Sequence, residues 1–142
     1  MEVVARILKS TFAGVALGAV LTTVVFAASV LVDGGRVGEA FGFGLAIGVV
    51  GALLGGLIGL AAGALKLGPI GGALAGIVAT LAAVAFYVLV FGQPGRFSYF
   101  LRESVVVVAT LGLPCVLTGI LTGRIATRLR RDEQLSSARP QA

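Results

Sequence analysis

The sequence predicts an all-α integral membrane protein, a four-helix bundle, and three observations support this fold class. Apolar residues make up 58% of the chain and charged residues only 12%, whereas about a quarter of the residues in ordinary soluble domains are charged. Four stretches with few or no charges reach the roughly 18 to 20 residues that a helix needs to cross a bilayer. Glycines recur in these stretches three or four positions apart, and on a helix this spacing places them on one face.

The expected spans are separated by short segments that contain helix breakers. Polar and glycine-rich residues occupy 33–39, the sequence Lys-Leu-Gly-Pro follows the second span, and Gly-Gln-Pro-Gly-Arg follows the third. One transmembrane domain over residues 1–131 is therefore predicted, and we expect the tail at 132–142 to be disordered because it has no apolar periodicity. The four spans are expected at about residues 10–32, 40–65, 70–91 and 104–124.

The first apolar run permits two interpretations. Arg6 and Lys9 precede it, an arrangement typical of either a signal peptide or a first transmembrane helix. The run is longer than the usual signal-peptide core and further spans follow, so a retained helix is predicted; cleavage near Ala28 is the alternative.

Basic and aromatic residues predict the orientation in the membrane. Lys and Arg are concentrated at the two ends of the chain and in the second connection, and cytoplasmic segments are enriched in these residues. We therefore predict a multi-pass protein of the cell (plasma) membrane with both termini in the cytoplasm. Almost all aromatic residues fall in the opposite half, and Phe97, Tyr99 and Phe100 are expected to lie on the membrane surface. The basic residues on the predicted cytoplasmic side are Arg6, Lys9, Lys66, Arg124, Arg128, Arg130, Arg131 and Arg139; the other connections hold Arg36, Arg96 and Arg102.

Glycines in the second span predict a helix-packing surface of the glycine-zipper kind. Small residues allow helix backbones to approach closely, which matters in lipid because burial of apolar groups between helices gains little there. The partner of this face is either another helix of the chain or the same helix of a second subunit. The predicted packing residues are Gly44, Gly48, Gly51, Gly55 and Gly59 in this span, Gly14 and Gly18 in the first, Gly72 and Gly76 in the third, and Gly112, Gly119 and Gly123 in the fourth.

The two halves of the chain resemble each other. A shift of 58 positions places the first span on the third, and a shift of 64 places the second on the fourth. A chain so rich in Gly, Ala, Val and Leu also matches itself by chance, so both chance and duplication remain open. A duplication predicts two tandem helical hairpins related as a parallel repeat. The second span has extra glycines, because Gly44, Gly51 and Gly63 correspond to Val108, Cys115 and Thr127.

A few residues within or beside the spans have both a functional and a purely structural interpretation. Pro114, in the middle of the fourth span, is either a hinge or one of the prolines common in transmembrane helices. The basic residues Arg124, Arg128, Arg130 and Arg131 either recruit anionic lipid or an acidic partner, or only set the topology. Hydroxyl side chains bond either to a neighbouring helix or to their own helix; these are Thr22, Ser29, Thr80 and Thr118.

The functional prediction depends on which residue types the spans lack. No span has an ionisable residue in its middle, and such residues usually mark coupled transport. The chain has no histidine and one cysteine, so we expect no catalytic residues, no metal, no cofactor and no enzymatic activity. The basic residues flank apolar segments, so the expected partners are membrane lipids, with either a second copy or another membrane protein, and not nucleic acid. A structural, assembly or accessory subunit is predicted; the alternative is a passive pore or small-solute permease.

Overall fold

The computed structural model describes residues 2–91 and 97–137, and this part of the chain is built from helices without strands. All four helices are long and apolar enough to cross a membrane, which confirms the all-α fold class with four such helices. The helices are α1 (Glu2–Val32), α2 (Val37–Ala64), α3 (Pro69–Phe91) and α4 (Phe97–Ser137).

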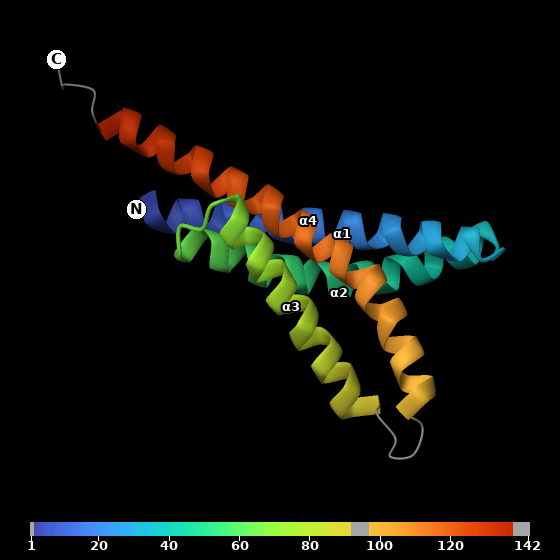
Figure 1. Ribbon diagram of the computed structural model, residues 1–142. Coiled ribbons are helices and arrows are strands. Elements are labelled where there is room, and N and C mark those ends of the chain that lie inside the picture. The colour runs from blue at the N-terminus through green and yellow to red at the C-terminus, as the bar shows by residue number, and fades with distance from the viewer. Residues whose placement is uncertain (1, 92–96, 138–142) are drawn as a thin grey trace.

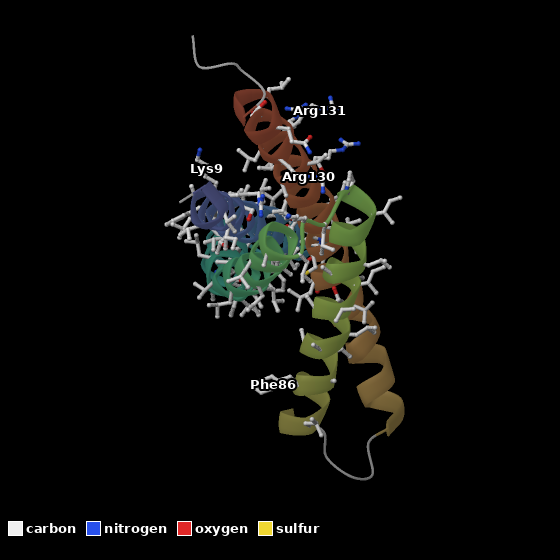
Figure 2. The ribbon with its side chains drawn as sticks, turned by 90° about the vertical axis from the view of Figure 1, so that its left-hand side faces the viewer. Lys9, Phe86, Arg130 and Arg131 are labelled. Atoms are coloured by element: carbon white, nitrogen blue, oxygen red, sulfur yellow. The ribbon has the colours of Figure 1, made fainter. Side chains whose placement is uncertain are left out.

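The helices form two antiparallel hairpins, α1 with α2 and α3 with α4 (Figure 1). The hairpins cross near the end of the molecule that holds both termini and the connection between α2 and α3 (Figure 1). Away from this end they diverge, and when α1 and α2 are seen end-on, α3 and α4 run across the view (Figure 2). The two hairpins are therefore splayed, an arrangement that the sequence pattern does not predict.

The end of α2 is set by local backbone chemistry. The amide of Leu65 donates to Ala61 at 2.9 Å, and the amide of Leu67 donates to Ala62 at 3.0 Å. Between them Lys66 has a φ of 55°, in the left-handed region that usually favours glycine at this position after a helix. The 28 residues of α2 span about 42 Å at 1.5 Å per residue. This length exceeds a hydrocarbon core of about 30 Å, so α2 must tilt or extend beyond the core.

Helix α4 differs most from the predicted boundaries. It begins at Phe97 and ends at Ser137, so the backbone of the segment expected on the membrane surface forms its first turns. Residues 132–137, expected to be disordered, also continue the helix, whereas 138–142 lie outside the described residues. Arg128 and Asp132 are four residues apart, a spacing that favours helix in water, and Pro114 does not interrupt α4.

Candidate functional site

The glycine stripe of α2, defined as Gly44, Gly48, Gly51, Gly55 and Gly59, is covered by α1. A Cβ atom placed on Gly55 would meet the carbonyl of Gly14 and lie 2.9 Å from the Cα of Gly18. Farther along, Gly59 lies against Ser10 and Thr11. Only a residue without a side chain fits at this separation between the helix backbones. The partner of the stripe is therefore another helix of the same chain.

The second hairpin repeats this mode of packing. A Cβ atom on Gly72 would meet the carbonyl of Gly119 and lie 3.4 Å from the Cα of Gly123. One turn farther, a Cβ atom on Gly76 would lie 2.9 Å from the Cα of Val116. Helices α3 and α4 are thus also in backbone contact, which is formed by Gly72, Gly76, Gly119 and Gly123 but not by Gly112.

The contacts of the two hairpins correspond under the shifts of 58 and 64 positions. A Cβ atom on Gly14 would lie 3.0 Å from the Cα of Gly59, and the equivalent distance for Gly72 and Gly123 is 3.4 Å. Matched sequence letters alone do not require matched contacts, so this correspondence is a structural argument for two related hairpins. The contact Gly14–Gly55 corresponds to Gly72–Gly119, Gly18–Gly51 corresponds to Gly76–Cys115, and Thr11–Gly59 corresponds to Pro69–Gly123.

The extra glycines of α2 explain how the hairpins differ. A Cβ atom on Gly44 would lie 3.2 Å from the carbonyl oxygen of Thr23, so α1 and α2 remain in contact at this level. Its counterpart Val108 is 43% exposed, and the nearest atom to a Cβ on Gly112 is Cγ2 of Thr80 at 3.5 Å. The first hairpin is therefore closed over a longer stretch than the second, in which Val108 is exposed and Gly112 makes no close contact with the described backbone of α3.

Hydroxyl groups mostly bond within their own helix. Ser29 donates to the carbonyl of Phe26 at 2.8 Å and Thr80 donates to that of Gly76 at 2.9 Å, which is the structural alternative predicted for them. In the described part of the chain, the buried hydroxyl oxygens of Thr22 and Thr118 have no hydrogen-bond partner. Pro114 is fully buried within α4, and its role as a hinge remains a prediction.

A buried arginine is the main feature that sequence reasoning missed. Arg6 is 4% exposed, and its Nε donates to the carbonyl of Gly63 at 3.3 Å, in the last turn of α2. A cation is favourable there because the C-terminal end of a helix carries partial negative charge. The sequence does indicate that Arg6 is buried, because small and polar residues follow it at four-residue spacing on one face of α1. The residues on this face are Arg6, Ser10, Gly14, Gly18 and Thr22, and all five are buried.

The basic end of α4, defined as Arg124, Arg128, Arg130 and Arg131, is exposed. Arg130 and Arg131 lie near the C-terminal end of the chain, and Phe86 lies near the opposite end of the second hairpin (Figure 2). Two adjoining hollows share Arg124 and Arg128. The first, of about 310 Å³, is lined by Pro69, Arg124, Thr127, Arg128 and Arg131; the second, of about 260 Å³, is lined by Leu17, Leu121, Arg124, Ile125 and Arg128.

These features define a class of protein: a multi-pass membrane protein whose spans are joined by glycine contacts. Within the residues that the structure describes, no group of three or more His, Cys, Asp or Glu side chains is arranged to hold a metal ion. No protein-family model, curated protein or solved structure matches the chain.

Proposed function

We propose that this protein is a non-enzymatic structural, assembly or accessory subunit of a larger membrane complex. The observation that carries the proposal is that the small and polar residues of the protein mostly pack inside it. Most of the glycines and most of the buried hydroxyl side chains lie in contacts within the chain. The faces that remain for other molecules are therefore bulky and aliphatic.

The outward face of α2 is the surface best suited to such a partner. Leu53 is 67% exposed and Leu57 is 63% exposed, whereas Ile58 on the other side of the helix is buried at 2%. Leu53 and Leu57 are four residues apart and therefore share one face. In a membrane this face meets either lipid or another protein.

Photo-crosslinking from this face tests the proposal. With p-benzoylphenylalanine in place of Leu53 or Leu57, we expect crosslinking in native membranes to the same single protein. Leu74, on α3 and 58% exposed, is the matched control, and we expect it not to capture that protein. Crosslinks to lipid or to other copies of the chain alone, from both α2 positions, would contradict an accessory role.

The pore or permease alternative makes a different prediction. In a pore without charges, glycine carbonyls and threonine hydroxyls would line the path, but many of these groups lie against the opposite helix of a hairpin. We therefore expect liposomes that contain the purified protein to show no flux of common ions or small neutral solutes above protein-free liposomes. Flux that is reduced by a bulky substitution at a buried position would favour the pore.

We further propose that both termini lie in the cytoplasm and that the connection between α1 and α2 lies outside the plasma membrane. Lys9 lies near the N-terminal end of α1, Arg36 lies just beyond its C-terminal end, and both are exposed. In a Cys115→Ala background, we expect a membrane-impermeant maleimide to label Arg36→Cys in intact cells and to label Lys9→Cys only after lysis. Cys115→Ala is a mild background change because the first hairpin has a glycine at the equivalent position. The reverse labelling pattern would overturn the proposed orientation.

A further inference from the structure

The basic end of α4 combines positive charge with an apolar groove. Arg124, Arg128 and Arg131 line the first hollow together with Thr127 and Pro69. The second hollow adjoins it through Arg124 and Arg128 and is otherwise lined by Leu17 of α1 and by Leu121 and Ile125 of α4. Among the residues described, no acidic side chain lines either hollow. Asp132 lies one turn from Arg128 but lines neither hollow, so each hollow is lined by arginine donors and, in the described part of the chain, by no carboxylate.

The first hollow lies beside the connection between α2 and α3. A Cβ atom on Gly123 would lie 3.0 Å from the Cα of Pro69, the first residue of α3. Arg124 is therefore at the level of the connection between α2 and α3, where two of the candidate spans end and begin. The first amides of a helix have no partner within it, so the start of α3 at Pro69 adds positive partial charge to the first hollow.

We propose that these two hollows form one binding site for an anionic phospholipid. The phosphate of the headgroup binds among Arg124, Arg128 and Arg131, since guanidinium groups match phosphate geometry. An acyl chain lies along the groove between α1 and α4 that Leu17, Leu121 and Ile125 line. This apolar extension is the reason to assign a lipid, because a free phosphate ion makes no use of it. The site goes beyond the general attraction of basic residues to an anionic membrane surface.

Native mass spectrometry of the purified full-length protein in detergent tests the site, because a micelle of neutral detergent has no anionic surface. We expect one molecule of dioleoyl phosphatidylglycerol to bind, and dioleoyl phosphatidylcholine to bind more weakly. Arg124→Gln and Arg128→Gln should each weaken binding about fivefold, the effect of one surface cation near lipid. Arg130→Gln is the matched control: Arg130 is exposed on the same helix but lines neither hollow, and we expect a change below about twofold.

A variant that leaves the charge unchanged tests whether lipid binding depends on the shape of the site as well as on its charge. Thr127 is exposed and lines the first hollow, so Thr127→Trp should fill this hollow and abolish the bound phosphatidylglycerol while every arginine remains. Thermal stability without added lipid must equal that of the native protein in each variant used. An equal loss for Arg130→Gln, equal binding of phosphatidylcholine, or full displacement by millimolar inorganic phosphate would each overturn the lipid site.

Discussion

Replacing Gly55 with leucine is expected to break the contact between α1 and α2. The added Cβ would meet the backbone of Gly14 and lie 2.9 Å from the Cα of Gly18, and a backbone cannot move aside as a flexible side chain can. Inserting atoms into a well-packed site usually costs about 1 to 3 kcal/mol, and a backbone clash places this variant at the upper end of that range or above it. Thermal unfolding in detergent, followed by circular dichroism, measures the loss.

Gly42→Leu is the matched control for this prediction. Gly42 lies on the same helix, and a Cβ atom placed there would meet nothing within 4 Å. Because glycine costs about 1 kcal/mol in a helix relative to good helix formers, we expect this variant to be as stable as the native protein or slightly more stable. If Gly55→Leu unfolds at the native temperature as well, the glycine stripe does not hold α1 and α2 together.

Replacing Arg6 with glutamate is expected to have a second large effect. The arginine is buried and donates to the carbonyl of Gly63, so a carboxylate there would face carbonyl oxygens at the negative end of α2. A buried charge without compensation costs about 3 to 5 kcal/mol. We expect the variant to unfold at a lower temperature than the native protein, or to accumulate poorly in the membrane.

Lys9→Glu separates this packing effect from the effect of charge on topology. It changes the net charge by the same amount, lies three residues along the same helix end, and is exposed. Both variants weaken the positive charge of the predicted cytoplasmic side equally, but only Arg6→Glu alters a buried contact. Equal loss of stability in the two variants would mean that Arg6 acts through topology alone.

The glycine faces could be predicted because helix geometry is local. Side-chain direction repeats every 3.6 residues, so the spacing of Gly48, Gly55 and Gly59 places them on one side of α2 before any partner is known. The same local logic identified the equivalent glycines in the second hairpin. Arg6 was counted only as a basic residue of the cytoplasmic side, although its four-residue spacing to Ser10 and Gly14 places it on the buried face.

Helix ends were predicted less well, because the expected boundaries followed hydropathy and not backbone hydrogen bonding. The charged residues after Gly123 end the apolar run but do not end α4, which continues to Ser137. In the same way, α1 already includes Arg6 and Lys9 in its first turns. A change from lipid to water ends a hydrophobic span, whereas a helix ends where breakers or missing partners stop its hydrogen bonds.

The sequence by itself determined the membrane class, the four spans, the small-residue faces and the concentration of basic residues at one end. These properties follow from composition and from periodicity within each segment. Only the tertiary structure decided that α1 covers the stripe of α2, that the two hairpins diverge, and that Arg124 and Arg128 line hollows beside α1 and α3. Which helix packs against which depends on contacts between residues far apart in the chain. Judged by local pattern alone, several of the glycine faces would fit one another nearly as well.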